Sequence, residues 1–142
     1  MSFSLTLLII IITCLFSIPA FQNEALKERM LFWPYRIKRN REWYRFMSGA
    51  FVHADAMHLI FNMYALLVLG NPLESALGRN KLLAILLVSQ IGASLTSLYF
   101  NPANQPSVGV SGALFGLFAA TAVISKRYGL DTRQIYVIVG IN

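Results

Sequence analysis

Residues 82–125, with the sequence LLAILLVSQIGASLTSLYFNPANQPSVGVSGALFGLFAATAVIS, decide the fold because they contain no Asp, Glu, Lys or Arg. A helix that crosses a ~30 Å hydrocarbon core needs about 20 largely apolar residues, so this stretch is too long for one span. The polar segment 101–106, NPANQP, divides it, since Asn and Pro favour turns and loops over helix interiors. The stretch therefore predicts two membrane-spanning helices joined by a loop.

Three further stretches, residues 1–23, 56–73 and 134–142, also lack charged residues. Hydrophobic residues make up 56% of the chain and charged residues only 13%, which is too apolar for the surface of an ordinary soluble domain. We therefore predict an all-α fold, a polytopic transmembrane helix bundle built as a single domain over residues 1–142. The predicted spans are about 2–19, 55–71, 81–100 and 111–125, with the start of a fifth at 133–142.

The predicted fifth span has only nine uncharged residues, 134–142, and nothing that short crosses a bilayer. We therefore expect the sequence to be part of a longer protein. The alternative that residues 5–18 form a cleaved signal peptide is disfavoured because no basic residue precedes them.

The predicted first loop, residues 20–54, mixes basic and aromatic side chains. This pattern is typical of amphipathic segments that lie among lipid headgroups. With the net charge of +6, it indicates contact with anionic lipid headgroups and the bilayer rather than with nucleic acid. Counting positive charges does not fix the orientation, since the connections at 72–80 and 126–132, on the opposite side, also carry bases.

Ser111 opens the fourth predicted span in the motif VGVSGALFG, residues 108–116. Gly109 permits a positive φ or a close approach of the backbone to a substrate, and free N–H groups at a helix start can stabilise an oxyanion. Such a site suits acyl transfer. The alternative is that Gly112 and Gly116 form a packing face for another helix. The soluble G-x-S-x-G elbow does not match, because Ala113 takes the place of its last glycine.

Two histidines and an asparagine, His53, His58 and Asn62, stand at the start of the second predicted span. His58 and Asn62 are four residues apart, so they share one helical face and can both donate hydrogen bonds toward a neighbouring helix, as an oxyanion hole requires. The alternative places the histidines at the water interface and makes Asn62 a bridge between helices. A metal site is disfavoured because a zinc site needs more ligands than these histidines and Asp55 provide.

Taken together, these motifs and Trp43-Tyr44-Arg45 resemble the bacterial type of the rhomboid family of intramembrane serine proteases. The resemblance extends from about residue 42 to 116 and includes Gly70, Glu74 and Gly78. It implies an enzyme without a cofactor that cleaves transmembrane protein substrates. The implied roles are Ser111 as nucleophile, His58, Asn62 and the Ser111 backbone N–H as oxyanion hole, and His53, Gly109, Gly112, Phe115, Trp43 and Arg45 as supporting residues.

The family's general base is a histidine in the sixth span, and no histidine follows His58 in this sequence. Phe115, one turn after Ser111, matches the family's aromatic residue that packs on that histidine. We therefore expect the base beyond Asn142 and six spans in the complete protein. A non-catalytic rhomboid-like scaffold that binds transmembrane helices, with or without further subunits, is the alternative.

The resemblance further implies a multi-pass protein of the bacterial inner membrane. Its first loop and active site would face the extracytoplasmic side, and its N-terminus the cytoplasm.

Overall fold

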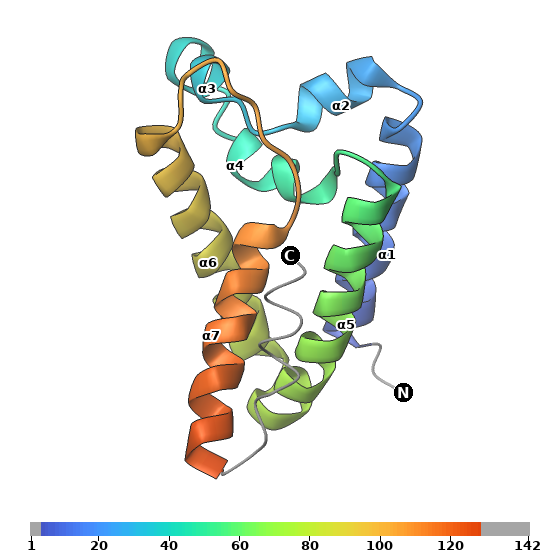
Figure 1. Ribbon diagram of the computed structural model, residues 1–142, viewed down its shortest axis with the longest axis vertical. Coiled ribbons are helices and arrows are strands. Elements are labelled where there is room, and N and C mark those ends of the chain that lie inside the picture. Colours follow the sequence, from blue (N-terminus) through green and yellow to red (C-terminus); the bar gives the residue numbers. More distant parts are fainter. Residues whose placement is uncertain (1–3, 129–142) are drawn as a thin grey trace.

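The computed structural model describes residues 4–128 and consists of helices joined by short connections (Figure 1). The prediction of an all-α fold is confirmed for this part of the chain. The predicted start of a fifth span, 133–142, lies outside the described residues. The elements are α1 (Leu5–Ala20), α2 (Glu24–Met30), α3 (Pro34–Asn40), α4 (Arg45–Ser48), the 3-10 helix η1 (Gly49–Phe51), α5 (Ala56–Leu77), α6 (Arg79–Phe100) and α7 (Ser111–Tyr128).

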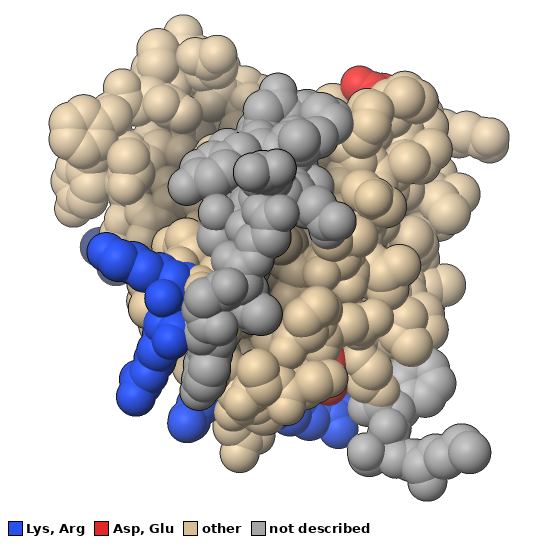
Figure 2. Space-filling view, turned by 60° about the horizontal axis from the view of Figure 1, so that its bottom comes forward, with Lys and Arg blue, Asp and Glu red and all other residues tan. Residues whose placement is uncertain are grey.

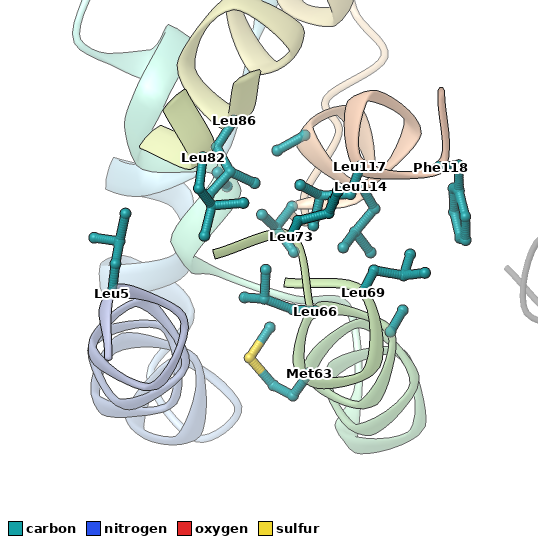
Figure 3. Close-up of a cluster of buried hydrophobic side chains, with 14 of the residues drawn as sticks. Leu5, Met63, Leu66, Leu69, Leu73, Leu82, Leu86, Leu114, Leu117 and Phe118 are labelled. Carbon is teal, nitrogen blue, oxygen red and sulfur yellow. The ribbon is translucent and has the colours of Figure 1, made fainter. Parts of the chain in front are cut away.

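Four long helices, α1, α5, α6 and α7, form a bundle, and the short helices α2, α3 and α4 lie at the end where α1 finishes and α5 begins (Figure 1). Leucines dominate the interior because all four helices turn an apolar face toward one another (Figure 3). The buried cluster includes Leu5, Met63, Leu66, Leu69, Leu73, Leu82, Leu86, Leu114, Leu117 and Phe118.

The outer faces of the bundle are apolar as well. A helix that is hydrophobic on all sides is typical of a protein core or of a membrane span. Of the described helices, Ala56–Leu77 and Arg79–Phe100 are long and apolar enough to cross a membrane, whereas the apolar α1 is shorter. The count of four spans therefore stays a prediction. Exposed large apolar side chains include Leu15, Ile18, Ile60, Tyr64, Val88, Tyr99 and Val123.

The connection predicted at 72–80 is much shorter in the structure. Helix α5 continues through Pro72 to Leu77, and only Gly78 separates it from α6. An interior proline costs a helix about 3 kcal/mol. Here the helix continues because Leu69 and Leu73 on either side of Pro72 are buried in the core. Gly78 makes the reversal with a φ of +83°, which side chains other than glycine rarely adopt.

Glu74, near the end of α5, holds the first turn of α1. Its carboxylate accepts hydrogen bonds from the backbone N–H groups of Leu5 (2.7 Å) and Thr6 (2.9 Å). It also accepts from the hydroxyls of Ser4 (2.7 Å) and Thr6 (2.8 Å). The N–H groups at a helix start have no partner within the helix and favour a negative charge, so Glu74 ties α1 to α5. Both helices approach closely there, since a Cβ on Gly70 would lie 2.8 Å from Thr6 Cγ2.

Basic residues mark this same end of the bundle, where α6 begins and α7 ends. Arg79 and Lys81 stand in the first turn of α6, and Lys126 and Arg127 in the last turn of α7. Figure 2, turned to bring this end forward, shows Lys and Arg side chains gathered at the left and lower edge of the view, with only small areas of Asp and Glu. Charged residues at helix ends, with none in between, fit helices that pass through an apolar layer.

The first loop is hydrogen-bonded to the segment that precedes α7. Phe32 and Ser107 form an antiparallel bridge, with Phe32 N–H donating to Ser107 O (2.9 Å) and Ser107 N–H to Phe32 O (2.8 Å). Tyr35 N–H donates to Ala103 O (2.9 Å). A second small cluster of Phe32, Ile37, Leu98 and Phe46 packs beneath these contacts. The two segments that approach Ser111 are thus fastened to each other.

Candidate active site

Ser111 is the first residue of α7, at the junction of loop and helix that the sequence predicts. The carbonyl of Val110 accepts the first bonds of the helix, from Ala113 N–H (2.9 Å) and Leu114 N–H (3.1 Å). The backbone N–H groups of Ser111 and Gly112 donate to no other described residue. Two free donors at a helix start are the elements of an oxyanion hole. The side chain of Ser111 is half-buried.

Gly109, two residues before Ser111, lies against the rings of His53 and His58. Its φ of +104° is strained for any other residue, and its N–H donates to Gly49 O at 2.9 Å. A Cβ at this position would lie 2.9 Å from His58 Cε1 and 3.0 Å from His58 Nε2. Glycine is therefore required here both by the backbone conformation and by the His58 ring packed against it.

His58 and Asn62 lie in the first two turns of α5. Asp55 caps this helix by accepting a hydrogen bond from His58 N–H at 2.8 Å, which is a common reason for Asp at the N-cap. Asn62 is fully buried, and its Nδ2 donates to the carbonyl of His58 at 2.8 Å. The Asn62 Oδ1 atom has no hydrogen-bond partner among the described residues. One Nδ2–H of Asn62 remains for a ligand, since an amide has two.

His53 is completely buried directly beside His58. The two ring centroids are 5.0 Å apart, with the ring planes at 74°. Its Nδ1 lies 2.9 Å from the hydroxyl of Ser17 on α1. Burial, reinforced by the charge of His58 and partly opposed by Asp55, lowers the pKa of His53 from 6.5 to about 4. His53 is therefore uncharged at neutral pH.

A cavity of about 250 Å³ opens beside Ser111. Ser111, Gly109, Gly112 and Phe115 form one wall, but His58 and Asn62 are not part of the lining. His58 thus contacts Gly109 without lining the cavity, whereas Ser111 lines the cavity. The opposite wall is contributed by α6 and the first loop, through Gln90, Ala93, Ser94, Ser97, Phe32 and Gly49.

The α6 wall was not predicted from the sequence. Gln90 is nearly buried, and its Nε2 lies 3.4 Å from Ser94 Oγ, while its Oε1 has no partner among the described residues. The Ser94 hydroxyl donates to Phe46 O at 3.1 Å. The available signal was a Gln inside an uncharged span, since polar side chains in membrane helices are costly and are often functional.

The glycines after Ser111 pack closely on α6. A Cβ on Gly112 would lie 2.5 Å from Ala93 Cβ, and one on Gly116 would collide with Ser89. The packing interpretation of these glycines is therefore compatible with a site at Ser111, because Gly112 serves both the helix contact and the cavity wall. Phe115, one turn after Ser111, is 62% exposed and packs edge-on against Phe118.

Arg45 fastens the first loop. Although fully buried, its guanidinium pairs with the Glu42 carboxylate and donates to the carbonyls of Glu28 (2.8 Å) and Leu31 (2.7 Å). Hydrogen bonds from Asn40 and then Arg45 lower the pKa of Glu42. Trp43 is largely exposed and packs on Phe46, with ring centroids 6.0 Å apart. Neither residue lines the cavity, but Arg45 holds the carbonyl of Leu31, which precedes the cavity-lining Phe32.

A family model for the Rhomboid domain matches residues 40–141. The chain is 38% identical over 93 residues to "Rhomboid-like protein 11, chloroplastic" of Arabidopsis thaliana, covering 66% of this chain and 32% of that one. It is 35% identical over 103 residues to "Rhomboid protease AarA" of Providencia stuartii, covering 63% and 37%. With "Rhomboid protease GluP" of Bacillus subtilis (strain 168), the identity is 36% over 106 residues, covering 71% and 20%. The chain thus aligns with between a fifth and somewhat more than a third of these relatives' lengths.

Proposed function

This chain belongs to the rhomboid family, and from this premise we propose that it is an intramembrane serine endopeptidase that cleaves transmembrane-helix substrates. The observation that carries this function is the position of Ser111. Ser111 lines a cavity, at a helix start where two backbone N–H groups have no backbone partner among residues 4–128. Nucleophile and oxyanion donors in one place are the requirements for acyl transfer.

In the proposed reaction, Ser111 Oγ attacks the scissile carbonyl and forms a tetrahedral oxyanion. The backbone N–H of Ser111, the His58 ring and the free N–H of Asn62 donate hydrogen bonds to that oxyanion. His58 and Asn62 do not line the cavity in its present shape. For their side chains to reach the oxyanion, the 108–110 segment must shift when the substrate binds. Collapse expels the amine, and water then hydrolyses the acyl-enzyme.

The hydroxyl of Ser111 needs a general base to lose its proton. The base in this proposal is a histidine outside residues 1–142, as the family resemblance implies. Phe115 is the residue on which that histidine packs, because its exposed ring stands one turn from Ser111 on the same side of α7.

Rhomboid-family homologues are integral membrane proteins, and the apolar helices of this chain agree with that location. As part of the same proposal, the protein is of the bacterial type and lies in the inner membrane with its first loop and active site on the extracytoplasmic side. The basic end of the bundle then faces the cytoplasm, with Arg79, Lys81, Lys126 and Arg127. This agrees with the excess of Lys and Arg in the short cytoplasmic connections of membrane proteins. The basic and aromatic first loop contacts anionic headgroups on the other side.

Labelling of the complete protein with a fluorophosphonate probe tests the assignment of Ser111. We expect labelling of the unmodified protein, complete loss in Ser111→Ala, and labelling retained in Ser107→Ala, which removes a second serine hydroxyl from the same cavity. Labelling that survives Ser111→Ala would overturn the assignment. A complete protein that binds transmembrane helices but is never labelled would instead be a scaffold.

A further inference from the structure

Ser17 is a polar residue in an otherwise apolar part of α1, and it is completely buried. Burying a hydroxyl costs about 1–3 kcal/mol unless hydrogen bonds compensate for the loss of water. The hydroxyl of Ser17 has two neighbours, the carbonyl of Phe51 and the Nδ1 atom of His53, each at 2.9 Å. Phe51 is the last residue of η1, and His53 packs against His58.

The two contacts of Ser17 determine where the proton of His53 lies. A hydroxyl carries one proton, and a carbonyl oxygen can only accept. Ser17 therefore donates its proton to Phe51 O and accepts a hydrogen bond from His53 Nδ1–H. No other assignment satisfies both contacts. A neutral imidazole carries a single proton, so Nε2 of His53 is left with a lone pair.

That lone pair lies in the interior, beside the proposed oxyanion hole. His53 Nε2 is buried and has no hydrogen-bond partner within residues 4–128. His53 Cδ2, the ring atom bonded to Nε2, lies 3.6 Å from the Cβ position of Gly109, the same position that His58 approaches within 3.0 Å. The two imidazoles thus flank Gly109 together, and the tautomer of His53 decides whether the nitrogen bonded to Cδ2 is a donor or an acceptor.

We propose that Ser17 is a positioning residue that holds His53 in the Nδ1–H tautomer, so that an uncharged His53 with an Nε2 acceptor supports the placement of His58 and Gly109 next to Ser111. Nε2 has no partner among the described residues in either tautomer, so the two tautomers differ at Ser17, which would lose one of its two hydrogen bonds in the Nε2–H form. Helix α1 contributes to the site in this way although Ser17 does not line the cavity. An effect of Ser17 on catalysis rests on the proposed protease function, whereas its effect on the tautomer of His53 does not.

Thr13 provides a matched control on the same helix. It lies four residues before Ser17, on the same face of α1, and is also completely buried. Its Oγ1 has no hydrogen-bond partner among the described residues. Thr13→Ala therefore removes a buried hydroxyl from α1 without breaking a hydrogen bond, and Ser17→Ala removes one that makes two.

The experiment is nitrogen NMR of the complete protein in detergent, with ¹⁵N-labelled histidine and the His53 signals assigned by their absence in His53→Asn. At neutral pH we expect His53 to be protonated on Nδ1 and unprotonated on Nε2. In Ser17→Ala, signals of the Nε2–H tautomer should appear, and in Thr13→Ala the spectrum of His53 should be unchanged. For peptide cleavage, Ser17→Ala should lower kcat roughly tenfold at unchanged KM, in proportion to one lost positioning hydrogen bond.

A protonated Nε2 in the unmodified protein overturns the proposal, and this result does not depend on whether Ser17→Ala folds. An unchanged tautomer in a folded Ser17→Ala protein overturns it as well. If cleavage continues in Ser111→Ala, the proposed protease mechanism fails, but the NMR spectrum still decides the role of Ser17.

Discussion

The two ends of the bundle treat their buried polar groups differently. Where α1 begins, the Glu74 carboxylate accepts four hydrogen bonds that bind α1 to α5. At the opposite end, four buried side-chain atoms have no partner among the described residues: Trp33 Nε1, His53 Nε2, Asn62 Oδ1 and Gln90 Oε1. Unpaired buried polar atoms cost stability. The difference agrees with a Glu74 end that stabilises the fold and with the proposed substrate site at the Ser111 end.

The largest effect that would distinguish the two ends is expected from Asn62→Ala. If Asn62 donates to an oxyanion, its removal should lower kcat by about 10²–10³-fold. Thermal stability should change little, because Asn62 makes one hydrogen bond, to the carbonyl of His58 one turn earlier, and leaves Oδ1 unpaired. The measurement is peptidase kinetics with a melting curve on the same preparation.

Asn71→Ala is the control for this variant, since Asn71 lies on the same helix near Glu74 and its side chain makes only one long hydrogen bond among the described residues, from Ser4 (3.4 Å). It should leave kcat unchanged. Equal losses of activity in the two variants would remove Asn62 from the oxyanion hole.

The next effect concerns the pH dependence of stability, to which His53 contributes. Its pKa is about 4 in the folded protein and 6.5 in the unfolded chain, so the unfolded chain binds more protons between these values. Above pH 6.5, His53 is neutral in both states and does not reduce the stability. As the pH falls from 6.5 to 4, the unfolded chain binds a proton that the folded protein does not, so the free energy of unfolding falls. The loss should reach about 3 kcal/mol.

Unfolding of the detergent-solubilised protein, followed between pH 7 and pH 4 by circular dichroism, measures this slope. In His53→Asn, the side-chain amide can still donate to Ser17 but does not titrate, so the slope should become flatter. A slope that is the same in both proteins would show that His53 is already charged, or accessible to water, in the folded state.

A smaller effect, on stability alone, is expected at the other end from Glu74→Gln. The amide keeps one acceptor oxygen but turns an NH₂ group toward the N–H groups of Leu5 and Thr6, so about 2 kcal/mol of unfolding free energy should be lost. The kcat of the folded fraction should be unchanged. Glu24→Gln, at an exposed carboxylate, is the control for a charge change alone. A loss of kcat without a loss of stability would contradict the division between the two ends.

Much of the fold could be predicted because its signals are local. Uncharged stretches, the breakers at 101–106 and the glycine before Ser111 indicate helices and the position of Ser111 without knowledge of the packing. The prediction was wrong at Pro72, where a local breaker was overridden by buried neighbours on both sides. The small-residue face of Gly112 was anticipated as an alternative, but its partner, Ala93 on α6, was not.

The sequence by itself determined an all-α chain with long apolar helices and a serine at the start of α7, because hydrophobicity, helix breaking and capping depend on neighbouring residues. Only the tertiary structure decided which groups meet: Gly109 with His58, Ser17 with His53, and Glu74 with the first turn of α1. These partners are 51, 36 and 69 residues apart in the sequence, respectively (109 − 58 = 51 for the first pair). Contacts over such separations depend on how the helices pack, which no local pattern records.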